Sequence, residues 1–191
     1  MTLSLLAVLL CAGRALAGRR TGFAVDAAIV AVAVAAWHDG AGPLLQPRAA
    51  NVPLYVLAAI VIFTVSAVLT TTSRKHYFSR RVRLHAMPWR QLAGPVLLAP
   101  LHEELIWRVL LQSLIAASLG AAAALAVVAA GFTAWHRERL AGDARQLAEF
   151  GLFSLTLGAV FAISRDPLAV LTIHVVRNLL ILSIQPEHAS A

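Results

Sequence analysis

Residues 52–72 read VPLYVLAAIVIFTVSAVLTTT, and no charged side chain interrupts them. A helix of about 20 apolar residues is long enough to cross the hydrocarbon core of a bilayer. Further apolar runs occupy residues 1–17, 21–37, 91–118, 121–135, 146–164 and 168–184. We therefore predict an all-α fold, a polytopic transmembrane helical bundle of about six or seven spans.

The composition favours the same fold class. Hydrophobic residues make up 60% of the 191 residues, charged residues make up 13%, and the mean hydropathy is +0.78. An ordinary soluble domain has about 25% charged residues. These values exclude a disordered protein and argue against a soluble globular domain.

Polar segments divide the predicted bundle. Residues 38–51 hold Gly40, Gly42, Pro43 and Pro47 and predict a loop, and residues 74–90 form a basic segment. We predict N-terminal helices with the basic segment in 1–90, a helical core in 91–184 and a polar tail in 185–191, all within one membrane domain. Pro95 and Pro100 are expected to divide the run 91–118 into a lead-in segment and a main helix.

The net charge of +7 is explained by topology. The basic residues gather between apolar runs, as in the cytoplasmic loops of membrane proteins, so segments 74–90 and 137–145 are expected inside. The bilayer is thus the expected partner, and nucleic acid is not. We expect a multi-pass integral protein of the bacterial plasma membrane, as the small size suggests. Arginines follow the apolar run 1–17, which favours a first span or an interfacial helix over a signal peptide.

Ionisable side chains gather in three of the predicted spans, where each costs several kcal/mol. Glu104 and Arg108 are four residues apart and can pair on one helix face. Glu103 lies about 100° around the helix from Glu104, so it needs a partner on another helix or a proton. The same four-residue spacing places Phe132 beside His136, and His174 beside Asn178.

This set of side chains can hydrolyse a peptide bond. A carboxylate and an imidazole can hold a water molecule and take its proton, and a second imidazole with an amide can stabilise the oxyanion that forms. Glu103, His136 and His174 could instead hold zinc, because two histidines and one glutamate form a known catalytic ligand set. The sequence has no HExxH motif, and spacing alone does not choose between the two mechanisms.

Three motifs occur in order on separate predicted helices: EExxxR at 103–108, FxxxH at 132–136 and HxxxN at 174–178. Together with the lead-in Ala99-Pro100-Leu101, they resemble the motifs of the CPBP family, the CAAX proteases and bacteriocin-processing enzymes also called Abi. The resemblance spans about residues 95–182, and the best-known members of this family are the type II CAAX prenyl endopeptidases. Trp107 and Val109 stand where that family usually has Phe and Gly.

The resemblance implies an intramembrane glutamic endopeptidase. We expect no cofactor, and a zinc metalloprotease stays the alternative. Glu103 would activate water with His136 as its partner, and His174 and Asn178 would hold the oxyanion. Glu104, Arg108 and Phe132 would support them. The implied substrate is a membrane-associated polypeptide with a CaaX-like tail, a leader peptide or a sorting tag.

Two other functions stay open at this point. A non-catalytic bacteriocin-immunity or scaffold protein could use the same fold, although the complete set of four site residues argues against it. A small transporter with a proton relay fits the carboxylate–histidine cluster, but the sequence shows no inverted repeat. No role is assigned to Asp26, His102 or Arg177.

Overall fold

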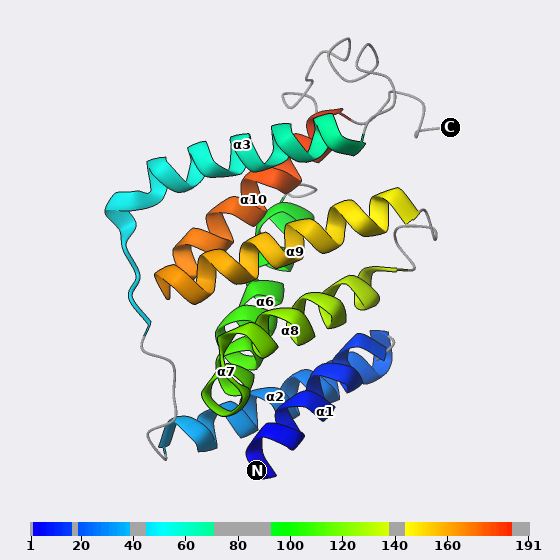
Figure 1. Ribbon diagram of the computed structural model, residues 1–191, viewed down its shortest axis with the longest axis vertical. Helices are drawn as coiled ribbons and strands as arrows, with labels where there is room; N and C mark the ends of the chain where they lie inside the picture. The colour runs from blue at the N-terminus through cyan, green and yellow to red at the C-terminus, as the bar shows by residue number, and fades with distance from the viewer. Residues whose placement is uncertain (1, 17–18, 39–44, 71–92, 138–143, 185–191) are drawn as a thin grey trace.

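The computed structural model describes residues 2–16, 19–38, 45–70, 93–137 and 144–184 (Figure 1). Every regular element within these ranges is helical, which agrees with the predicted all-α fold. The basic segment 74–90, most of the loop 137–145 and the tail 185–191 lie outside the described residues. The elements are α1 (Thr2–Leu16), α2 (Arg19–His38), η1 (Ala49–Asn51), α3 (Val52–Thr70), η3 (Ala93–Leu98), α6 (Ala99–Glu104), η4 (Leu105–Gln112), α7 (Ser113–Leu119), α8 (Ala121–His136), α9 (Ala144–Ser164) and α10 (Pro167–Ile184).

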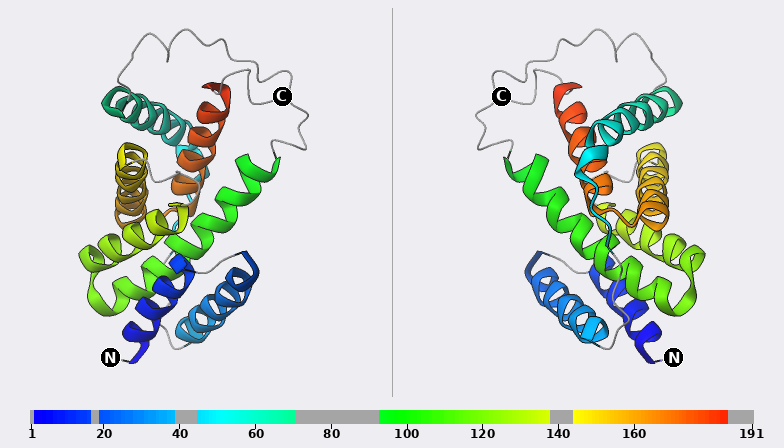
Figure 2. Two further views of the ribbon diagram at one scale, coloured as in Figure 1. Left: turned by 90° about the vertical axis from the view of Figure 1, so that its right-hand side faces the viewer. Right: turned by 90° about the vertical axis from the view of Figure 1, so that its left-hand side faces the viewer.

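The helices form a layer in which chain order and spatial order differ. Helix α3 packs on α10, α10 on α9, α9 on α8, and α8 on α1, as Figure 1 shows from top to bottom. The run formed by η3, α6, η4 and α7 crosses this layer and contacts α2, α8 and α10 (Figure 2). This run therefore lies between the N-terminal helix pair and the C-terminal helices.

Two helices of the described chain are long and apolar enough to cross a membrane. They span Ala49–Ser66 and Ala144–Ser164, and shorter apolar helices accompany them. One face of α3 exposes Leu54, Leu57, Ile60, Val61 and Val65. A contiguous apolar face of this kind suits contact with lipid. The count of six or seven spans stays a prediction.

The run 93–119 differs from the expectation for residues 91–118. The helical backbone continues through Pro95 and Pro100, so no break separates the lead-in segment from the main helix. The helix type changes instead, from π in η3 to α in α6, back to π in η4 and to α in α7. The main helix begins with α6 at Ala99, and Pro100 lies in its first turn. The run ends at Gly120, whose φ of 86° suits a residue without a side chain.

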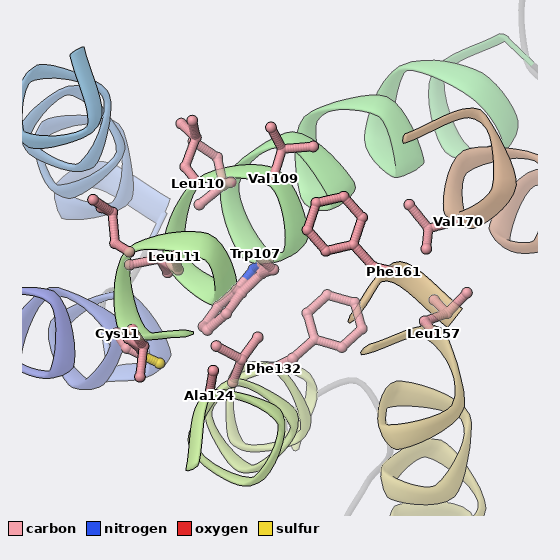
Figure 3. Close-up of a cluster of buried hydrophobic side chains, with 14 of the residues drawn as sticks. Cys11, Trp107, Val109, Leu110, Leu111, Ala124, Phe132, Leu157, Phe161 and Val170 are labelled. Atoms are coloured by element: carbon pink, nitrogen blue, oxygen red, sulfur yellow. The ribbon is translucent and has the colours of Figure 1, made fainter. Parts of the chain in front are cut away.

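The core forms around Trp107 of η4, which is fully buried (Figure 3). Its ring lies 5.6 Å from that of Phe132 and 6.1 Å from that of Trp135. Helix α8 comes close enough for this because Gly131 has no side chain. A Cβ atom there would lie 2.9 Å from Cys11 Sγ and 3.0 Å from Trp107 Cζ3.

Replacing Gly131 with Ala is expected to destabilise the protein by about 1–3 kcal/mol, because the buried Trp107 ring and the Cys11 side chain must both shift. The matched control is Gly94→Ala, since a Cβ atom at Gly94 would meet nothing within 4 Å. The midpoint of thermal unfolding in detergent micelles measures both effects. Equal midpoints for the two variants would contradict the close packing of α8 on η4.

The turn between α9 and α10 is fixed by Asp166, which is fully buried. Its carboxylate accepts hydrogen bonds from the Leu168 N–H at 2.8 Å, the Tyr55 hydroxyl at 2.7 Å and the Arg48 N–H at 3.0 Å. Asp166 is thus the N-cap of α10, with Pro167 at the first helical position. One carboxylate joins α10 to α3 and to the chain before α3.

Asp166→Ala is expected to cost about 2–3 kcal/mol, because it removes a helix cap and leaves a buried hydroxyl without its acceptor. Tyr55→Phe removes one of the three hydrogen bonds and should cost about 1 kcal/mol. Unfolding of both variants in mixed micelles gives the comparison. A smaller loss for Asp166→Ala than for Tyr55→Phe would show that the cap does not hold α10.

Candidate active site

Side chains from three separate elements meet at Glu103. Its Oε2 atom lies 3.8 Å from His136 Nε2 and 3.7 Å from His174 Nε2. Helices α6, α8 and α10 supply these side chains, and exposure is 5% for Glu103, 7% for His136 and 3% for His174. Glu103 was expected to need a partner on another helix, and it has two such partners, His136 and His174.

The two adjacent glutamates contact opposite edges of one imidazole ring. Glu104 Oε1 accepts from His174 Nδ1 at 2.6 Å, while Glu103 Oε2 lies 3.7 Å from His174 Nε2. This arrangement follows from the rotation of about 100° between neighbouring helical residues. Sequence reasoning missed the bond between Glu104 and His174, which gives the supporting glutamate a direct partner on α10.

The ring of His136 has a defined orientation. Its Nδ1 lies 3.0 Å from the carbonyl oxygen of Phe132, which can only accept, so we assign the Nδ1 proton to this bond. In the neutral ring, Nε2 then carries the lone pair, and this is the atom nearest to Glu103. The rings of Phe132, Trp135 and Phe150 lie 4.4–4.6 Å from the imidazole and hold it.

Arg108, one helical turn after Glu104, places a positive charge close to the two carboxylates. Its Nε lies 3.6 Å from Glu104 Oε2, which agrees with the predicted pairing at four residues. Its Nη2 donates to Ser154 of α9, to Oγ at 3.0 Å and to the carbonyl oxygen at 3.3 Å. The guanidinium carbon lies 4.7 Å from the centroid of the Phe132 ring. The fully buried charge thus has a carboxylate, a hydroxyl and an aromatic face as partners.

Asn178 lies one turn beyond His174 on α10, and its amide has a backbone partner. Asn178 Nδ2 donates to the carbonyl oxygen of Pro95 at 3.0 Å. In a π-helical pattern that carbonyl would accept from the residue five positions later, which is Pro100 and has no N–H. The side chain therefore satisfies a carbonyl that a proline leaves open, a role that sequence reasoning did not foresee.

A further, partly buried ion pair joins Arg177 of α10 to Glu149 of α9. Arg177 Nη2 donates to both oxygens of Glu149, at 3.0 and 2.9 Å, and Ser66 Oγ donates to Glu149 Oε1 at 2.5 Å. The guanidinium also lies 4.2 Å from the ring centroid of Phe153, whose ring is 5.4 Å from that of His174. Arg177 thus joins α10 to α9. The signal in the sequence was a buried arginine that needs an acidic partner.

The residues do not fit a zinc ion as they stand. Two donors of a tetrahedral zinc site are about 3.3 Å apart when each bond is about 2.0 Å, whereas Glu103 Oε2 is 3.7 and 3.8 Å from the two imidazole nitrogens. Within the described ranges, no group of three or more His, Cys, Asp and Glu side chains is arranged to hold a metal ion.

Comparisons with known proteins agree with the motifs. The family model described as "Type II CAAX prenyl endopeptidase Rce1-like" matches residues 85–180. Neither the curated proteins nor the solved structures gave a match. The matched region contains Glu103, His136, His174 and Asn178 and excludes helices α1 to α3. Because the match covers half of the chain, the protein belongs to the Rce1-like family of type II CAAX prenyl endopeptidases.

Proposed function

We propose that the protein is an intramembrane endopeptidase in which Glu103 activates the attacking water. The observation that carries this proposal is the placement of Glu103 Oε2 within 3.8 Å of the Nε2 atoms of His136 and His174. Each imidazole is held through its Nδ1 atom, so each turns Nε2 toward the carboxylate. The family match supports a protease, and the geometry supports these residues as its catalytic groups.

The first step is attack by water on the scissile carbonyl carbon. The two nitrogens are too far from Glu103 for direct hydrogen bonds, yet close enough for one water molecule to contact Glu103 and His136 together. That water donates one proton to the Glu103 carboxylate and a hydrogen bond to the lone pair of His136 Nε2. Its oxygen bonds to the carbonyl carbon, and the carbonyl π electrons move onto the oxygen.

The second step is collapse of the tetrahedral intermediate. The C–N bond breaks, the oxyanion reforms a carbonyl, and the proton held by Glu103 passes to the departing nitrogen. The products are a new carboxyl terminus and a new amino terminus. Glu103 ends the cycle as a carboxylate, and the hydrolysis needs no oxidant or reductant.

The charge balance of the site supports an oxyanion role for His174. The carboxylates of Glu103 and Glu104 carry two negative charges, and Arg108 carries one positive charge. An imidazolium at His174 makes the buried cluster neutral and is stabilised by its 2.6 Å bond to Glu104. Its Nε2–H would donate to the oxyanion, with the second amide proton of Asn178 as a further donor.

The substrate that fits best is a membrane-associated polypeptide. The family description points to a prenylated CAAX terminus, and a leader peptide or sorting tag would present a similar chain at the bilayer. We also propose that the protein is a multi-pass protein of about six or seven spans. The two long apolar helices support insertion in a bilayer. The small size favours a bacterial plasma membrane.

The test compares membranes that contain the native chain with membranes that contain Glu103→Gln. Mass spectrometry maps the peptide termini in both. Termini that occur only with the native chain would support the proposal and identify the substrate. Identical termini with both proteins folded and inserted, in a host supplied with a farnesylated CAAX reporter, would favour the non-catalytic scaffold.

Chelation is expected to leave cleavage unchanged. Glutamate chemistry needs no metal, so treatment with a zinc chelator followed by dialysis should keep kcat within about twofold, which is under about 0.5 kcal/mol in barrier height. The measurement is kcat before and after treatment, with a zinc metalloprotease as the positive control. Loss of activity that added zinc restores would replace the glutamate mechanism by the zinc alternative.

A further inference from the structure

A separate cluster of charged and polar side chains joins the N-terminal helices α1 and α2 to α6. Arg14 Nε of α1 lies 2.5 Å from Asp26 Oδ1 of α2, and His102 Nε2 of α6 lies 3.1 Å from Asp26 Oδ2. Exposure of the side chains is 6% for Arg14 and 11% for Asp26. Both charges therefore lie inside the bundle, and neither α1 nor α2 belongs to the region that matches the family.

The chain leaves room for this pair. Gly22 precedes Asp26 by one helical turn, and a Cβ atom at Gly22 would lie 3.2 Å from Arg14 Nη1. The guanidinium carbon of Arg14 also lies 4.3 Å from the centroid of the Trp135 ring. Arg14 thus contacts a carboxylate on α2 and an aromatic ring on α8, a cation–π arrangement.

Two members of this cluster are sequence neighbours of proposed catalytic residues. His102 immediately precedes Glu103, and Trp135 immediately precedes His136. The rings of Trp135 and His136 are 4.6 Å apart at an interplanar angle of 80°. One ion pair therefore touches the neighbours of both members of the Glu103–His136 pair, from helices that the family motifs do not include.

We propose that Arg14, Asp26, His102 and Trp135 form a positioning unit that sets the distance between Glu103 and His136. This inference rests on the proposed function of that pair. A buried ion pair adds little net stability compared with apolar side chains of similar size, because removing two charges from water offsets their attraction. What the pair does fix is geometry, since displacing a catalytic group by about 1 Å can lower the rate about 10²-fold.

The first test replaces both charges at once with Arg14→Met/Asp26→Leu. The apolar pair fills similar volume, so the variant is expected to insert and unfold at a midpoint equal to or above that of the native chain. Its kcat on the peptide substrate described below should fall about 10-fold while KM stays within about twofold. Positioning affects the transition state more than it affects substrate binding. Cys11→Ala, one turn earlier on α1, controls for altered packing of that helix. An unchanged kcat in the folded double variant would overturn the inference.

The second test uses His102, whose side chain is 48% exposed, so its replacement does not empty the core. His102→Gln keeps a donor that can reach Asp26 and should retain at least half of kcat. His102→Leu removes the donor and should lose about three- to tenfold, at an unchanged KM. Equal kcat values for the two variants would overturn the inference even if the double variant fails to fold.

The substrate for both tests is an internally quenched farnesylated CAAX peptide, or a peptide built on a cleavage site found by terminus mapping. Cleavage by the native chain and its loss in Glu103→Gln establish the proposed function first. If these hold and the positioning variants behave like the native chain, only the positioning unit is wrong. If the native chain cleaves neither peptide, both the proposed function and this inference are wrong.

Discussion

Replacing Glu103 with Gln is expected to lower kcat by about 10³-fold or more while the protein stays folded. Glutamine has nearly the same shape and can still contact both imidazoles, but it cannot take a proton from water. A general base contributes about 10²–10⁴-fold to a rate, and loss of its charge also weakens the hold on the attacking water. The loss corresponds to about 4 kcal/mol or more of transition-state stabilisation.

The measurement is kcat on the cleavable peptide, with thermal unfolding as the check on folding. Glu104→Gln is the matched comparison, because it removes the adjacent carboxylate from the same turn of α6. It should lose about 10–10²-fold, since Glu104 acts through the orientation and charge of His174. If Glu103→Gln keeps a tenth of native activity, or if Glu104→Gln loses more activity than Glu103→Gln, Glu103 is not the general base.

Replacing His136 with Phe is expected to lower kcat by about 10²–10³-fold at nearly native stability. The imidazole is enclosed by aromatic rings, so a phenyl ring fits the same space. What the variant loses is the lone pair of Nε2, which accepts from the attacking water beside Glu103. KM should change little, because the side chain acts on water rather than on the substrate.

His38→Phe is the control for this substitution, since His38 is exposed at the end of α2 and far along the chain from the motifs. Steady-state kinetics on both variants separate kcat from KM. An unchanged kcat in His136→Phe, or a rise in KM alone, would place His136 in substrate binding and leave Glu103 without its proposed partner.

Much of the fold could be predicted because backbone polar groups inside a bilayer must form hydrogen bonds within the protein. Apolar runs of sufficient length must be helical, so the observed helices begin and end close to the predicted runs; α10, for example, spans Pro167–Ile184 against a prediction of 168–184. The helix continues through Pro95 and Pro100 for a physical reason. A proline removes one N–H, and the carbonyl oxygen of Pro95 accepts from Asn178 Nδ2 instead.

The site could be predicted where spacing decides it. The pairing of Glu104 with Arg108 lies within one helix, so periodicity suffices. The bond between Glu104 and His174, and the bond from Asn178 to Pro95, join helices about 70 and 80 residues apart in sequence, where spacing carries no information. Asp26 had no assigned role because its partners lie on α1 and α6. A buried charge predicts that a partner exists and does not name it.

The most direct test of the water-activation mechanism is a single turnover in H₂¹⁸O. The purified native chain, in excess over the cleavable peptide, reacts once, and mass spectrometry then locates the label. Direct attack by water predicts one ¹⁸O atom in the new carboxyl terminus of the product and none in the enzyme peptide that contains Glu103. Label in the Glu103 side chain would show that this carboxylate attacks the substrate itself, which contradicts its role as the base that activates water.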